Sequence, residues 1–179
     1  MACGRQLKRL GHRNWLLLER ADHAGGLASS VTDARGFTWD LGGHVVFSHF
    51  GEFDALLEET LGDELHHHDR SSYVRVADRW VPYPFQNNLR HLSEKMIEEC
   101  LDGLSDAPGG DPTMDFGTWM QATFGSGITR HFMAPYNFKV WATQPQEMAC
   151  DWIAERVSVV DYERASRNVR DGRDDVAWG

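Results

Sequence analysis

The chain has 179 residues, a length that suits one domain, or parts of two, with a core of its own. Hydrophobic residues make up 41% of it and charged residues 25%, and its 27 acidic residues outnumber 18 basic ones to give a formal net charge of -9. This charge excludes a general nucleic-acid binder, because such a protein needs a basic face.

The first third of the chain alternates helical and extended patterns. Residues 5–11 are typical of a helix end with Gly11 as its stop, and residues 14–19 form an apolar run that predicts a strand ending in a carboxylate. A second short strand is predicted at 37–41, and the spacing of apolar residues predicts a helix over 52–61.

The middle of the chain changes character. Residues 73–76 and 80–83 flank a short turn and predict a β-hairpin, and Ser93 is expected to cap a helix with one apolar face. Two or three helices are predicted within 115–160, whereas the segment after Glu163 is charged and shows no periodicity.

These patterns predict an α/β protein, α+β overall. We expect a partial FAD-binding, Rossmann-like domain at 1–65, a β-hairpin segment of a sheet domain at 66–90, a helical substrate-binding domain at 91–162 and a truncated tail at 163–179. The three cysteines are widely spaced and form no CxxC pair, so we expect free thiols and a cytoplasmic protein. No apolar run is long enough to span a membrane, and no membrane partner is expected.

Two glycine-rich strings are candidates for cofactor binding. Glu19, at the end of a predicted strand, is followed by Gly25-Gly26. In such a pattern the carboxylate accepts hydrogen bonds from ribose hydroxyls, and the glycines let the backbone approach a ligand closely. Gly42-Gly43 likewise lets the backbone approach a ligand closely, and His44 adds a polar side chain that could lie beside a ring system of that ligand. Either string by itself is equally compatible with an ordinary turn.

Two aromatic strings are candidates for nucleotide binding. Residues 80–88 alternate aromatics with prolines and end in three amides, a composition suited to stacking on a base or to a rigid packed loop. Residues 133–141 carry an amide and a tryptophan, with Arg156 downstream, whose planar guanidinium suits a pyrophosphate. The alternative interpretation is that aromatic residues at this density belong to the hydrophobic core. The three histidines at 66–68 lack a second ligand cluster, and no metal site is expected.

Taken together and in this order, these strings resemble UDP-galactopyranose mutases of the eukaryotic type. The resemblance covers residues 7–161 and is carried by 24–30, 36–49, 79–88 and 135–142. The glycine strings are shared with many flavin oxidoreductases, including amine-oxidase-like enzymes. The aromatic strings are more specific, and they favour the nucleotide interpretation over core packing.

The resemblance implies an FAD-dependent isomerase that interconverts UDP-galactopyranose and UDP-galactofuranose through a covalent sugar adduct on N5 of reduced FAD. It implies NADPH as the reductant of the flavin and UDP-galactose as the small-molecule substrate. By position, the catalytic residues would be His44 and Arg156.

The remaining roles also follow from the resemblance alone. The cofactor residues would be Glu19, Gly25, Gly26, Leu27, Gly42, Gly43 and His44. The substrate residues would be Phe47, Tyr83, Gln86, Asn137, Trp141 and Arg156, and NADPH would contact Arg70 and Ser72.

The chain also departs from the family pattern. It contains no GxGxxG turn, begins at a point inside the first family helix and is much shorter than family members. We therefore expect a fragment, a truncated gene product or a partial gene model, with exposed apolar surface that favours homo-oligomers. Two alternatives remain open, a fragment of an amine-oxidase-like flavin oxidoreductase and a non-catalytic remnant.

Overall fold

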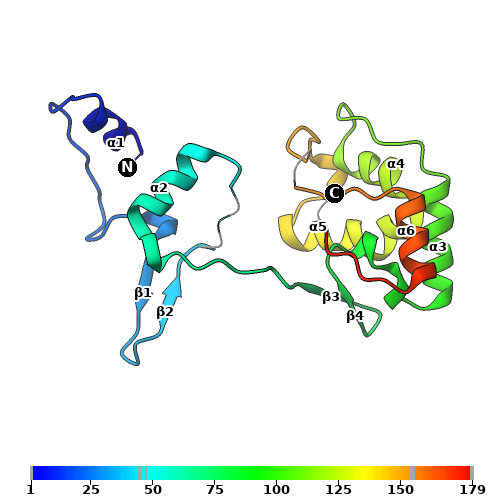
Figure 1. Cartoon of the computed structure of the whole chain (residues 1–179). Coiled ribbons are helices and arrows are strands. Elements are labelled where there is room, and N and C mark those ends of the chain that lie inside the picture. Colours follow the sequence, from blue (N-terminus) through cyan, green and yellow to red (C-terminus); the bar gives the residue numbers. More distant parts are fainter. Residues whose placement is uncertain (1, 44–45, 47, 154–155, 178–179) are drawn as a thin grey trace. The chain divides into compact units, whose positions relative to one another are not determined.

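The computed structural model describes residues 2–43, 46, 48–153 and 156–177. The chain divides into two compact units, Met1–His67 and His68–Gly179, and each is described by itself (Figure 1). Helices and strands occur in both units, which confirms the predicted mixed fold class. In the described residues no helix has the length and apolar character that crossing a membrane demands.

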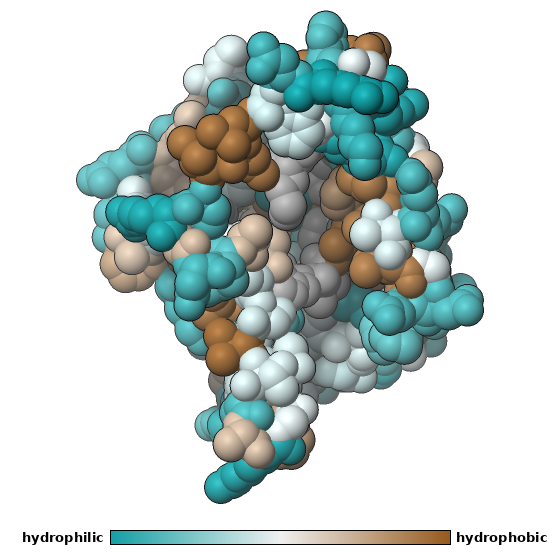
Figure 2. All heavy atoms as spheres, turned by 90° about the vertical axis from the view of Figure 1, so that its left-hand side faces the viewer, coloured by the Kyte–Doolittle hydropathy of each residue, from teal (hydrophilic) through white to brown (hydrophobic). Residues whose placement is uncertain are grey.

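The first unit is a small set of short elements. They are α1 (Ala2–Arg9), η1 (Gly26–Ala28), β1 (Ser30–Thr32), β2 (Thr38–Asp40), α2 (Gly51–Leu61) and η2 (Gly62–Glu64). The strands β1 and β2 form an antiparallel pair with Val31 opposite Trp39. None of the unit's described residues is buried, and Figure 2 shows apolar side chains open among hydrophilic ones on the face it presents.

The predicted strand at 14–19 is wrong. These residues lie in a segment without helix or strand, and Leu16, Leu17 and Leu18 are all exposed. A parallel strand forms only when a neighbour satisfies its backbone hydrogen bonds, and the strands of the described residues form two antiparallel pairs elsewhere. The apolar pattern alone therefore did not make a strand.

The second unit begins with a hairpin and continues as helices. Its elements are β3 (Tyr73–Val76), β4 (Arg79–Pro82), η3 (Phe85–Asn87), η4 (Leu89–His91), α3 (Glu94–Ser105), α4 (Phe116–Ile128), the π-helix η5 (Thr129–Met133), α5 (Ala134–Trp141), η6 (Pro145–Glu147) and α6 (Tyr162–Asp171). The predicted hairpin is confirmed, with Val76 opposite Arg79. Ala77 and Asp78 take positive φ at its turn, as a tight two-residue hairpin turn requires.

The core of the second unit lies where α3, α4 and the loop after β4 meet. It includes Phe85, Leu89, Phe116, Phe124 and Ile128, all completely buried. Gly125 has φ 70° and interrupts the helical geometry inside α4. At this point α3 and α4 approach so closely that a Cβ on Gly125 would overlap the carbonyl of Gly103.

Side-chain caps define where three helices begin. Ser93 caps α3 as predicted, and the carboxylates of Asp115 and Asp161 cap α4 and α6 by accepting from Thr118 N and Arg164 N. The charged segment after Glu163 shows no hydrophobic periodicity, yet it contains a helix, because α6 spans Tyr162–Asp171. Its buried face is narrow, formed by Ala165 and Asn168, and gives little hydrophobic signal.

Candidate functional site

In the first unit the two glycine strings meet at one end of the β1–β2 pair. An antiparallel pair places the start of one strand beside the end of the other, so Gly25, Gly26 and Leu27 precede β1 where Gly42 and Gly43 follow β2. The Leu41 amide donates to the Ser29 carbonyl at 3.1 Å, and an added Cβ on Gly42 would lie 2.7 Å from the Leu27 carbonyl oxygen. The tertiary fold thus joins strings that are 15 residues apart in the sequence.

This end of the unit fits a ligand that lies against bare backbone. Gly25 and Gly26 have φ values of 125° and 56°, which residues with side chains rarely adopt. An added Cβ on Gly26 would meet nothing within 4 Å, and Leu27 is exposed, so the outer side of this turn is open. The geometry therefore suits a cofactor that needs close backbone approach.

Glu19 lies six residues before Gly25 and is exposed in a segment without helix or strand. Its Oε1 accepts from the Ala21 amide at 2.9 Å. Hydrogen bonds from the backbone of Ala21 and then Arg20 hold the pKa of this carboxyl below its ordinary value. Glu19 is therefore an ionised acceptor at neutral pH, as a ribose-binding carboxylate would be.

In the second unit the structure brings Arg70, Ser72 and Tyr83 together. Arg70 Nε donates to Ser72 Oγ at 2.9 Å, and the Tyr83 amide donates to the Ser72 carbonyl at 2.9 Å. The Arg70 guanidinium stands 5.5 Å from the Tyr83 ring centroid, within cation–π range. Burial and the nearby Tyr136 raise the pKa of Tyr83, while Arg70 opposes the shift, so this phenol stays protonated at neutral pH.

The three amides after Tyr83 are buried and differ in how their side chains are bonded. Both polar atoms of the Asn88 amide bond to the protein's own backbone, whereas Asn87 donates its Nδ2 to a backbone carbonyl and has no partner for its Oδ1 among the described residues. Gln86 is 2% exposed, and its Nε2 donates to the Ser158 carbonyl. The opposite atom, Gln86 Oε1, is a buried acceptor with no hydrogen-bond partner among the described residues. Such an atom favours a ligand that offers an N–H or O–H donor.

Asn137 and Trp141 lie on α5, which continues directly from the π-helix η5. Asn137 is buried, and its Nδ2 donates to the Met133 carbonyl at 2.8 Å. Trp141 is half exposed and meets Trp152 edge to face with centroids 5.5 Å apart. Single π-helical turns inside helices often mark functional sites, because they shift the register of the side chains that follow.

Arg156 is exposed, and its amide donates to the Ile153 carbonyl at 2.7 Å. Two further residues from the sequence prediction, His44 and Phe47, lie outside the described residues.

Sequence reasoning missed two groups of residues, an aromatic stack beside Tyr83 and a polar pair that contacts Asn88. Phe132 stacks on Phe85 and on Tyr136, with centroids 4.7 and 4.9 Å apart, and Tyr83 meets Phe132 edge to face at 6.4 Å. The aromatic residues around Tyr136 were visible in the sequence, but only the tertiary fold shows that their rings stack. The second group is Asp175, whose backbone bonds the Asn88 amide, and Arg164, which pairs with Asp175; both fell in the segment that lacked periodicity.

Residues 1–178 match the model of a family described as flavin-containing amine oxidoreductases. The chain belongs to this family. Among solved structures it is similar to one titled the crystal structure of reduced UDP-galactopyranose mutase, with 45% sequence identity and a TM-score of 0.87. The alignment covers 97% of this chain and 38% of the mutase chain.

Proposed function

We propose that the chain carries FAD- and nucleotide-binding parts of an enzyme that interconverts UDP-galactopyranose and UDP-galactofuranose. The observation that carries this proposal is the 45% identity to a reduced UDP-galactopyranose mutase over 97% of the chain. The unpartnered acceptors Gln86 Oε1 and Asn87 Oδ1 are compatible with it, because a pyrimidine base offers an N–H donor.

FAD, when bound and reduced, would supply the nucleophile, its N5 nitrogen, for the anomeric carbon of the sugar. The chain's own part is to hold the cofactor. Glu19 would accept hydrogen bonds from ribose hydroxyls, and Gly25, Gly26 and Leu27 would line the pyrophosphate of the cofactor. Gly42, Gly43 and His44 would lie against the flavin ring.

The second unit would supply residues that bind the substrate. Tyr83, Gln86, Asn137 and Trp141 would contact the uridine end, with Gln86 Oε1 accepting from the base. Arg156 would bind the pyrophosphate, since a guanidinium donates two parallel hydrogen bonds to phosphate oxygens. Arg70 and Ser72 would contact NADPH, which would reduce the flavin.

The direct test is an assay of the purified chain loaded with FAD and reduced with dithionite. Given UDP-galactofuranose, it should form UDP-galactopyranose, separated by chromatography, and the reaction should stop when dithionite is omitted. Because the proposal assigns only parts of the enzyme to this chain, a chain that binds neither FAD nor UDP would contradict it, whereas product formation would show that these parts suffice for turnover.

A substitution separates the roles of the two units. Gln86→Leu should weaken UDP binding about tenfold, because it removes the acceptor for the base. FAD affinity should change less than twofold, because the proposed cofactor residues lie in the first unit. Gln121→Leu, an exposed glutamine on α4, is the matched control and should leave both affinities unchanged.

The family description favours a second candidate, an oxidase of amines. Hydrogen peroxide formed from amine substrates by the FAD-loaded chain, without any response to UDP-sugars, would support it. The UDP titration and the peroxide assay on one preparation decide between the two activities.

A further inference from the structure

The amide loop of Gln86–Asn88 is fastened to the chain that follows α6. Asn88 Nδ2 donates to the Asp175 carbonyl at 2.8 Å, and Asn88 Oδ1 accepts from the Asp175 amide at 2.9 Å. Asn87 Nδ2 donates to the Ala177 carbonyl at 3.0 Å. Two successive asparagines thus pair with the backbone of a segment almost ninety residues away.

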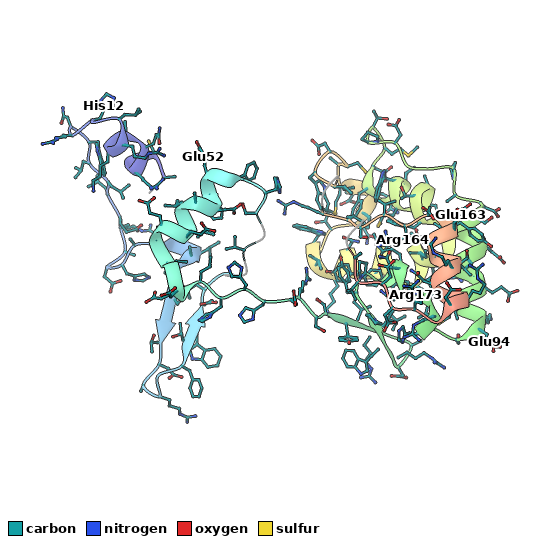
Figure 3. The ribbon with its side chains drawn as sticks, viewed as in Figure 1. His12, Glu52, Glu94, Glu163, Arg164 and Arg173 are labelled. Carbon is teal, nitrogen blue, oxygen red and sulfur yellow. The ribbon has the colours of Figure 1, made fainter. Side chains whose placement is uncertain are left out.

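The side chain of Asp175 ties the same segment to α6. Its two carboxylate oxygens accept from Arg164 Nε at 2.7 Å and Nη2 at 3.0 Å, a bidentate pair in which both side chains are mostly buried. Asn168 Nδ2, also on α6, bridges Asp175 Oδ2 and the Asn87 carbonyl, both at 3.1 Å. Figure 3 shows Arg164 near the start of α6, and Figure 1 shows the chain after α6 turning back along the unit.

The hydrogen bonds of this network hold the backbone on both sides of Gln86. On one side Asn88 Nδ2 also donates to the Pro84 carbonyl at 2.9 Å, and on the other Asn168 holds the Asn87 carbonyl. Gln86 is therefore flanked by backbone groups that the Asp175 network holds, and its orphaned acceptor has a fixed position. A preorganised acceptor binds a donor without the entropy cost of ordering the loop.

We propose that Asp175, held by Arg164, is a positioning residue that orders the loop of Tyr83 and Gln86 for the base of a uridine nucleotide. This inference rests on the proposed function for the identity of the ligand. Asp175 itself touches no proposed ligand position, and it acts through Asn88 and Asn168.

The neighbouring carboxylate provides a matched control. Asp174 Oδ1 pairs with Arg90 and His91, at 2.7 and 2.6 Å, and these residues follow the loop rather than flank Gln86. Asp174→Asn therefore removes the same charge one residue away and leaves the bonds to Asn87 and Asn88 in place.

The test compares Asp175→Asn with Asp174→Asn in the full chain. UDP and UMP affinities are measured by tryptophan fluorescence, FAD affinity by flavin fluorescence, and the order of the loop by hydrogen exchange in peptides covering 83–88, which exclude the Asp174 partners Arg90 and His91. Asp175→Asn should weaken UDP and UMP equally, by about tenfold, since the loop serves the base end. It should speed exchange in 83–88 and change FAD affinity less than twofold, whereas Asp174→Asn should change every one of these readouts less than twofold.

Arg164→Lys is a second variant that keeps the charge but loses the bidentate geometry, and it should give a smaller loss of the same kind. Unchanged UDP affinity in Asp175→Asn, with or without faster exchange, overturns the inference, as does an equal loss in Asp174→Asn. If the unsubstituted chain binds neither UDP nor UMP, the proposed function fails and so does the nucleotide part of the inference. The exchange comparison then still shows whether Asp175 orders the loop.

Discussion

Gly125 lies at a close contact between α3 and α4. Its φ of 70° disfavours any residue with a side chain, and a Cβ there would overlap the Gly103 carbonyl. The overlapping atoms belong to the backbone of another helix and cannot turn aside. Two costs therefore act together, conformational strain and overpacking.

We expect Gly125→Ala to lower the free energy of unfolding by about 2–5 kcal/mol, measured by urea denaturation. Gly172→Ala is the control for strain alone. Gly172 has φ 62°, but an added Cβ meets nothing within 4 Å, so its cost should be about 1 kcal/mol. Equal losses in the two variants would show that the close approach of α3 is unimportant.

The ionisation of the Asp175 carboxyl makes the free energy of unfolding depend on pH in the acid range. Arg164 donates two hydrogen bonds to it, and this bonding holds the pKa of the Asp175 carboxyl below its ordinary value. The contribution of a carboxyl whose pKa is lowered on folding is complete above its unfolded pKa of about 3.9, and it is lost as the pH falls through the lower folded value.

The difference in unfolding free energy between the native chain and Asp175→Asn should therefore be constant above about pH 5 and shrink below about pH 4. Urea denaturation from pH 7 to pH 2.5 measures it. Asp78→Asn, which removes an exposed ion pair with Arg75, should show little difference at any pH. A difference for Asp175→Asn that does not vary with pH would refute the linkage.

At the scale of the element, helix beginnings were easier to predict than helix faces. Ser93 was recognisable because its short polar side chain precedes an apolar periodic run. Asp161 has the same role before α6, but the helix that follows buries only Ala165 and Asn168. A helix held by polar contacts, chiefly those of Arg164 and Asn168 with Asp175, gives no hydrophobic period to detect.

The cap of α6 is itself testable. Asp161→Ala should cost about 1 kcal/mol of unfolding free energy, because the Arg164 amide loses the acceptor that now lies 2.7 Å away. Asp161→Ser should restore most of the loss, since serine also caps. Thermal denaturation followed by circular dichroism measures both, and equal stability of the alanine and serine variants would contradict the capping role.

At the scale of the whole molecule, the two units differ in how much they bury. The buried core residues all belong to the unit that begins at His68, and no described residue of the other unit is buried. Cooperative unfolding of the chain should therefore report on the second unit.

Phe124→Ala should accordingly lower the free energy of unfolding by about 3–5 kcal/mol, because it empties a completely buried site. Leu16→Ala, at a position 80% exposed, should change it by less than about 0.5 kcal/mol. Urea denaturation of both variants checks this, and a loss for Leu16→Ala as large as that for Phe124→Ala would contradict it.

The sequence by itself determined the local features of this protein and its family. Turn glycines, caps and the β3–β4 hairpin are set by residues close together in the chain, and the glycine and aromatic strings are sufficient to indicate the family. Only the tertiary structure decided that residues 14–19 form no strand, that two asparagines bind Asp175 and Ala177, and that Gln86 keeps a buried free acceptor. These outcomes depend on hydrogen-bond partners from distant segments, and a local pattern contains no information about which partner a polar group will meet.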